Sequence, residues 1–60
     1  MTIGKRIKEA RLAKGWTQRD LATKMGNTVT YISAIECDVY PPAPKSLMRF
    51  ERALGTRIVK

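Results

Sequence analysis

Apolar residues recur along this chain at intervals of three or four, the spacing that places them on one face of an α-helix. Ile3 and Ile7 give this pattern to a first predicted helix over residues 2–14, with Thr2 as its N-cap. Gly15 follows as the stop, since glycine readily adopts the left-handed conformation that closes a helix. The first segment is therefore predicted to be an amphipathic helix.

Two shorter amphipathic helices are predicted next, joined by a tight corner. Residues 17–20, Thr-Gln-Arg-Asp, have the pattern of a capping box at the start of the second helix. Gly26 ends that helix at a position where the chain must turn sharply. The third helix is expected over residues 28–37, with Ile32 and Ile35 on its buried side.

The helical pattern breaks at residues 38–44, Asp-Val-Tyr-Pro-Pro-Ala-Pro, because no helix crosses three prolines. This segment is predicted to be a stiff, extended connector. A fourth helix follows over residues 44–54, since proline is tolerated in the first helical turn. Its apolar face comprises Leu47, Phe50 and Leu54.

These segments predict one all-α domain over residues 1–60, a compact bundle of four to five short helices. A chain of 60 residues is near the lower limit for a single hydrophobic core without disulfides or metals. Trp16 is expected in that core, and Ile58 is expected to fold back onto it. The chain has no repeats and no strand-like alternation.

Charge is the first indication of function. Twelve Lys and Arg against five Asp and Glu give a net charge of +7, and the pI is near 10.2. Such an excess favours a polyanionic partner, either nucleic acid or an anionic membrane surface, although a solvated basic surface without a ligand has the same composition.

Several function classes are disfavoured. One cysteine, Cys37, and no histidine leave no disulfide framework and no zinc cluster, so we expect no metal and no cofactor. We read Cys37 as a small residue near a helix end; a redox sensor or covalent dimer is the alternative. No Gly-rich phosphate loop or paired carboxylates suggest an enzyme, and no small-molecule ligand is evident. Without a signal-peptide pattern or membrane span, we expect a cytoplasmic location.

Residues 18–37 have the spacing of a helix–turn–helix. Ala22 is small where the two helices would cross, Gly26 follows four positions later, and Ile32 packs back into the crossing six positions beyond. Ile35 completes the apolar set. We assign these residues to structure rather than to binding.

The segments Trp-Thr-Gln-Arg-Asp-Leu-Ala at 16–22, Met-Gly at 25–26 and Tyr-Ile-Ser-Ala-Ile-Glu at 31–36 resemble the lambdoid phage repressor and Cro family of XRE-type regulators. The resemblance extends over most of the chain and implies a lambda-repressor-like domain of five helices. It also implies sequence-specific binding of double-stranded DNA and transcriptional regulation of repressor type, by a dimer on a palindromic operator. A protein-interaction module of the same fold, antitoxin-like or a transcriptional bridging factor, is the alternative.

In such a fold the N-terminal turn of the third helix enters the major groove. The residues expected to read bases are Val29, Thr30 and Ser33, with Ala34 behind them. Their side chains are short and make no bidentate base contacts, so we expect DNA shape and water to contribute to specificity. For Val29, partial burial in the domain is the alternative.

Phosphate contacts are expected mainly where helix N-termini present free N–H groups. In the family, a glutamine at the position of Gln18 binds a phosphate. The full expected set is Gln18, Arg19, Asn27, Thr28, Tyr31 and Lys45. Relatives also pair the residues matching Arg11 and Glu36, which we assign to structure.

The chain departs from the family pattern at three places. Asp38 stands where relatives commonly have glycine, so the end of the third helix should be adjusted. The following loop carries Tyr40 and prolines instead of basic phosphate contacts. A fifth helix, which builds the dimer interface in many relatives, is expected only after the last residues. The chain is then a fragment, dimerises differently, or binds as a monomer.

Overall fold

The structure is a computed structural model that describes residues 2–58. These residues form four helices and no strand: α1 (Ile3–Ala13), α2 (Gln18–Met25), α3 (Val29–Glu36) and α4 (Pro44–Leu54). The predicted all-α bundle is confirmed. None of the helices in residues 2–58 has both the length and the apolar character needed to cross a membrane.

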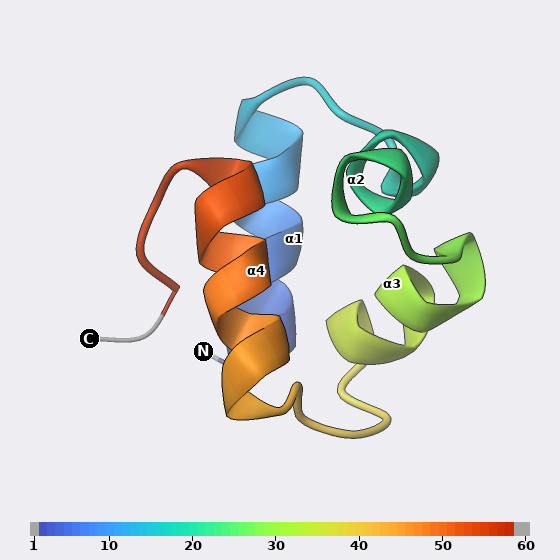
Figure 1. Ribbon diagram of the computed structural model, residues 1–60, viewed down its shortest axis with the longest axis vertical. Helices are drawn as coiled ribbons and strands as arrows, with labels where there is room; N and C mark the ends of the chain where they lie inside the picture. The colour runs from blue at the N-terminus through green and yellow to red at the C-terminus, as the bar shows by residue number, and fades with distance from the viewer. Residues whose placement is uncertain (1, 59–60) are drawn as a thin grey trace.

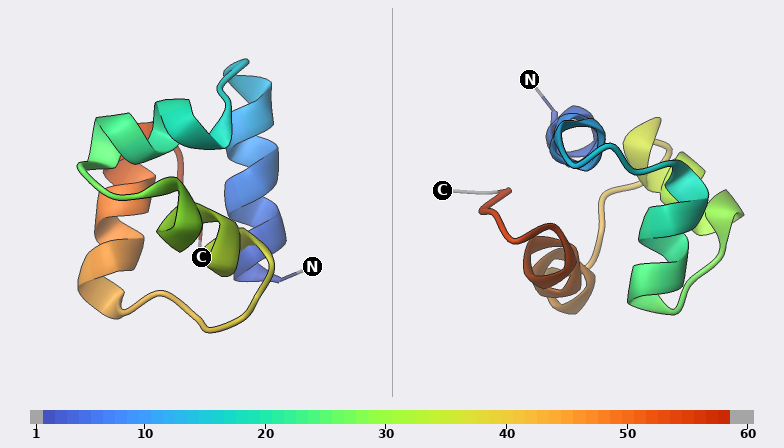
Figure 2. Two further views of the ribbon diagram at one scale, coloured as in Figure 1. Left: turned by 90° about the vertical axis from the view of Figure 1, so that its right-hand side faces the viewer. Right: turned by 90° about the horizontal axis from the view of Figure 1, so that it is seen from above.

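The helices surround a common core (Figure 1). In Figure 2 (left), α1 and α4 run side by side in the same direction, α2 lies across their C-terminal ends, and α3 lies in front of them. The buried hydrophobic residues are Ile7, Leu21, Ala22, Met25, Ile32, Ile35, Phe50, Leu54 and Ile58. Every described helix contributes to this one cluster, and the segment after α4 adds Ile58.

Local capping produces the helix ends that the sequence predicts. Thr17 and Asp20 form a complete capping box, in which the Thr17 side chain accepts from the Asp20 N–H and the Asp20 carboxylate accepts from the Thr17 N–H. Gly26 ends α2 in the left-handed conformation, with φ of 70°. The third helix is one residue shorter at each end than predicted because Thr28 and Cys37 are its caps.

Trp16 is only partly buried, so its expected place inside the core is wrong. The indole packs against the core cluster from outside. The ammonium groups of Lys14 and Lys24 lie 5.3 Å and 5.5 Å from its ring centroid. Cation–π attraction stabilises the ring in this position, where it covers the core while the two lysine ammonium groups stay hydrated.

Asp38 links the end of α3 to the start of α1. It adopts φ of 60°, which lies in the left-handed region. The position where relatives commonly have glycine is therefore left-handed here with an aspartate. Its carboxylate accepts hydrogen bonds from Thr2 Oγ1 at 2.7 Å and from the Gly4 N–H at 3.3 Å. The aspartate therefore satisfies donors at the N-terminus of α1 while reversing the chain after α3.

Candidate nucleic-acid interface

The corner between α2 and α3 is built by small and apolar side chains. Ala22 and Ile32 are 3% and 0% exposed, and these two helices pack directly on each other. The Asn27 N–H donates to the Ala22 carbonyl at 2.9 Å, which closes the turn after the left-handed Gly26. Ile35, also 0% exposed, fixes the inner face of α3 one turn further on. This packing directs the opposite face of α3 to solvent.

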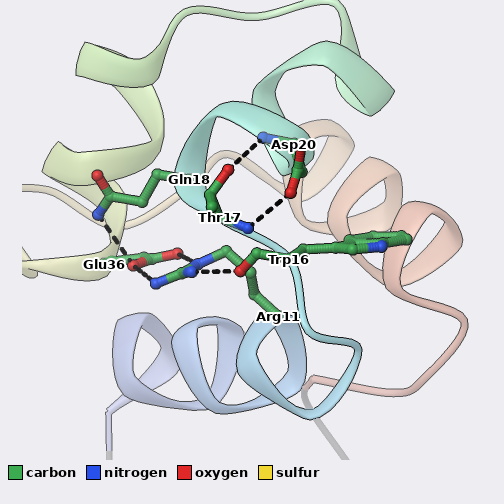
Figure 3. A network of polar contacts seen from close by, with 6 residues as sticks. All are labelled: Arg11, Trp16, Thr17, Gln18, Asp20 and Glu36. Atoms are coloured by element: carbon green, nitrogen blue, oxygen red, sulfur yellow. Dashed lines mark hydrogen bonds and ion pairs between the residues drawn. The ribbon is translucent and has the colours of Figure 1, made fainter.

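A buried polar network holds α3 against α1 (Figure 3). Arg11 donates from Nε to Glu36 Oε2 at 2.8 Å and from Nη2 to Oε1 at 3.2 Å. Its Nη1 donates to the Trp16 carbonyl at 2.6 Å. The side chains of Arg11 and Glu36 are 7% and 2% exposed. Each charge therefore needs the other to offset the cost of its removal from water.

Gln18 joins this network from the first turn of α2. Its Nε2 donates to Glu36 Oε1 at 3.2 Å, so the amide extends toward the end of α3 (Figure 3). A primary amide has two N–H donors, and one of them is used here. The geometry ties the half-buried Gln18 side chain to the pair that fixes α3.

The outer side of α3 and its neighbours form a shallow groove, which we call the α3 groove. Its lining residues are Gln18, Val29, Thr30, Ser33, Ala34, Cys37 and Val39. All four residues expected to read bases lie here, together with one of the six expected at phosphates. Val29 is 38% exposed and Thr30 is exposed, whereas Ser33 and Ala34 are half-buried.

The other expected phosphate contacts are more dispersed. Arg19, Asn27 and Thr28 are exposed around the N-termini of α2 and α3. The Thr28 hydroxyl oxygen accepts from the Tyr31 N–H at 3.1 Å, which leaves its O–H available as a donor. Lys45 is exposed on α4 and lines a different groove.

Tyr31 has a clear packing role. Its ring stacks on Phe50 with a centroid distance of 6.1 Å and an interplanar angle of 14°. Tyr40 lies 6.4 Å away on the connector between α3 and α4. Tyr31 is half-buried, so its aromatic body belongs to the domain's packing.

Sequence reasoning missed two members of the α3 groove. From the sequence alone, Cys37 is read only as a small residue near a helix end, and Val39 is read only as part of the connector. Cys37 is exposed and Val39 is 69% exposed. Helical periodicity could have indicated that Cys37 lies on the same face as the other groove residues. Val39 enters the groove because the chain reverses at Asp38, and helical periodicity does not predict such a turn.

The fold and this groove define a small helical domain with a helix–turn–helix whose second helix is presented to solvent. Residues 7–60 match the model of a helix-turn-helix family. The chain belongs to this family, and specifically to its XRE-type members.

Two solved structures share the fold. The crystal structure of SinR, the master regulator for biofilm formation, in complex with DNA has a TM-score of 0.86 at 33% identity, covering 95% of this chain and 92% of that chain. The restriction-modification controller protein C.Esp1396I has a TM-score of 0.83 at 41% identity, covering 90% and 69%.

Similar sequences also occur in eukaryotes. Multiprotein-bridging factor 1 of Debaryomyces hansenii is 40% identical over 58 residues, which is 97% of this chain. The endothelial differentiation-related factor 1 homologue of Danio rerio is 36% identical over 58 residues. The chain spans only 39% and 40% of the lengths of these relatives.

Proposed function

We propose that this domain binds double-stranded DNA sequence-specifically and regulates transcription, as a repressor, with α3 in the major groove. The observation that carries the proposal is the α3 groove, because it joins the solvent-facing side of α3 to the N-terminal turn of α2. A helix N-terminus favours a phosphate, and the adjacent helix face then meets base edges. The net charge of +7 favours the same partner.

In this proposal the contacts divide by chemistry. Thr30 and Ser33 donate to or accept from base edges, while Val29 contacts a thymine methyl and Ala34 lies behind them. Gln18 donates its second amide N–H to a phosphate. The other backbone contacts come from Arg19, Asn27, Thr28, Tyr31 and Lys45. These contacts position the domain without reading sequence.

The short side chains expected to read bases provide limited sequence discrimination by direct contact. We therefore infer that DNA deformability and bridging water contribute, and that two copies bind a palindromic operator. Doubling the half-site roughly squares the discrimination that one copy provides, because free energies of separate contacts add. We place the protein in the cytoplasm, at the nucleoid of a bacterial or phage-type system.

Selection of binding sites from random duplex DNA tests the proposal. The selected duplex and a scrambled version are then titrated across a range of salt concentrations. A palindromic selected sequence that binds clearly more tightly than the scrambled duplex supports the function of a sequence-specific regulator. Equal affinity for both duplexes with a steep salt dependence would reduce the function to non-specific basic binding.

A protein-interaction module is the second candidate, supported by the similarity to the multiprotein-bridging factors. On this alternative the α3 groove contacts a protein partner instead of base pairs. The same titration discriminates between the two functions. No measurable affinity for any selected duplex would favour the protein-interaction module.

A further inference from the structure

A second surface of the domain combines basic and apolar side chains. Two adjoining grooves on the outer side of α4 share Arg49 and Arg52; one adds Lys45 and Met48, and the other adds Lys24. We call these five residues the α4 basic surface. Among residues 2–58, no acidic side chain lines either groove, although Glu51 lines a third groove together with Met48 and Arg52. Four cations therefore line the two grooves, with one carboxylate at their edge.

Two of these cations are held in place by the fold. Arg49 donates from Nη2 to the Met25 carbonyl at 2.9 Å, which ties it to the C-terminus of α2. The Lys24 ammonium lies 5.5 Å from the centroid of the Trp16 ring. A guanidinium has five N–H donors, so Arg49 keeps others for a ligand. Cations positioned before binding lose less conformational entropy when a ligand arrives.

The α4 basic surface is separate from the α3 groove. None of its five residues lines that groove, and Lys45, in the first turn of α4, is the one member that we also assign to a DNA phosphate. Viewed from above, α3 and α4 occupy different sides of the domain (Figure 2, right). A ligand on the α4 basic surface therefore leaves the outer face of α3 available.

Met48 distinguishes between possible ligands. Its side chain is 63% exposed and lies in one groove with three cations. A phosphate backbone pairs with the cations but offers no apolar group to cover the thioether. An amphipathic helix with carboxylates beside an apolar side chain matches both features, because methionine adapts its shape to apolar partners.

We propose that the α4 basic surface binds an acidic amphipathic helix of a partner protein. Carboxylates of that helix pair with Arg49 and Arg52, where bidentate geometry is available, and an apolar side chain packs on Met48. The interaction goes beyond DNA binding, because it gives a domain bound through α3 a separate site for recruiting a protein.

The test uses the full chain and a fluorescent synthetic helical peptide with glutamates and leucines on one face, monitored by anisotropy. Arg52→Glu is expected to weaken peptide binding about tenfold, since an attraction becomes a repulsion. Met48→Ala is expected to weaken it about threefold through lost apolar contact. The control Lys8→Glu makes the same change of charge at an exposed position of α1 and should alter affinity less than about twofold.

Three outcomes would overturn the proposal. Equal losses for Lys8→Glu and Arg52→Glu would mean that net charge alone attracts the peptide. If a peptide with glutamine in place of leucine binds equally well, apolar packing on Met48 does not contribute to binding. A loss of duplex DNA affinity in Arg52→Glu as large as the loss for peptide would assign the surface to the DNA interface. Circular dichroism checks folding, and Arg52→Gln replaces the charge reversal if that variant unfolds.

Discussion

Gln18 Nε2 donates to Glu36 Oε1 across 3.2 Å, and this bond connects the rim of the α3 groove to the buried ion pair beneath it. Glu36 is thereby shared between Arg11, which holds α1, and Gln18, which begins α2. One carboxylate sets the relative positions of three helices. The side chain proposed to hold a phosphate is thus oriented by the same group that fixes the recognition helix.

Gln18→Ala is expected to lower affinity for the selected duplex about fivefold, by removing one phosphate hydrogen bond. Glu36 keeps both bonds from Arg11, so the free energy of unfolding should fall by less than about 1 kcal/mol. Gel-shift titration and urea denaturation measure the two effects. Thr23→Ala on the same helix is the control, and equal affinities for both variants would contradict the assigned role of Gln18.

Arg11→Met is expected to destabilise the domain by about 3 kcal/mol or more, because Glu36 would stay buried without its partner. Urea denaturation followed by circular dichroism measures the loss. The double variant Arg11→Met, Glu36→Leu should recover much of it, since no unpaired charge remains. A denaturation midpoint equal to that of the unmodified protein would refute the role given to this pair.

Gly4→Ala tests the close contact between the start of α1 and the end of α3. An added Cβ would lie 2.4 Å from the Ile35 carbonyl oxygen and 2.6 Å from Asp38 Oδ1. Alanine normally stabilises a helix interior by about 1 kcal/mol relative to glycine, but here we expect a net loss of about 2 kcal/mol.

The control is Gly15→Ala, where an added Cβ has no neighbour within 4 Å but φ is +73°. Its cost should be about 1 kcal/mol, from backbone strain alone. Thermal denaturation of both variants compares the two. A Gly4→Ala variant as stable as the unmodified protein would show that the helices separate without cost.

Lys45→Gln is expected to reduce the slope of log affinity against log salt by about 0.9, the value for one released phosphate contact. Its effect should be similar for selected and scrambled duplexes, because a phosphate contact carries no base information. Fluorescence titration at several salt concentrations provides the slopes. Lys8→Gln, exposed on α1, is the comparison; matching slopes for the two variants would exclude Lys45 from the interface.

The sequence was sufficient for the helices and their ends because those features depend on neighbours within one turn. The capping box at Thr17 and Asp20 spans three positions, and the left-handed closure at Gly26 needs only the missing side chain. Pro44 begins α4 for an equally local reason. The outward face of α3 followed from placing Ile32 and Ile35 inward.

Contacts between distant residues could not be derived in this way. Gln18 and Glu36 are 18 positions apart, and Gly4 and Asp38 are 34 apart. Whether such side chains meet depends on how the helices cross, which is decided by the shapes of all the core side chains together. Trp16 was misplaced for the same reason, since its apolar character did not reveal that Lys14 and Lys24 would meet its ring.

By itself, then, the sequence determined four helices, their caps, the tight corner and the set of short side chains on the outside of α3. Only the tertiary structure decided what surrounds that set. The turn at Asp38 brings Val39 into the α3 groove, and the buried pair directs Gln18 toward it. Helical periodicity records which way a side chain faces along its own axis, whereas the neighbours it meets are chosen by packing across the whole core.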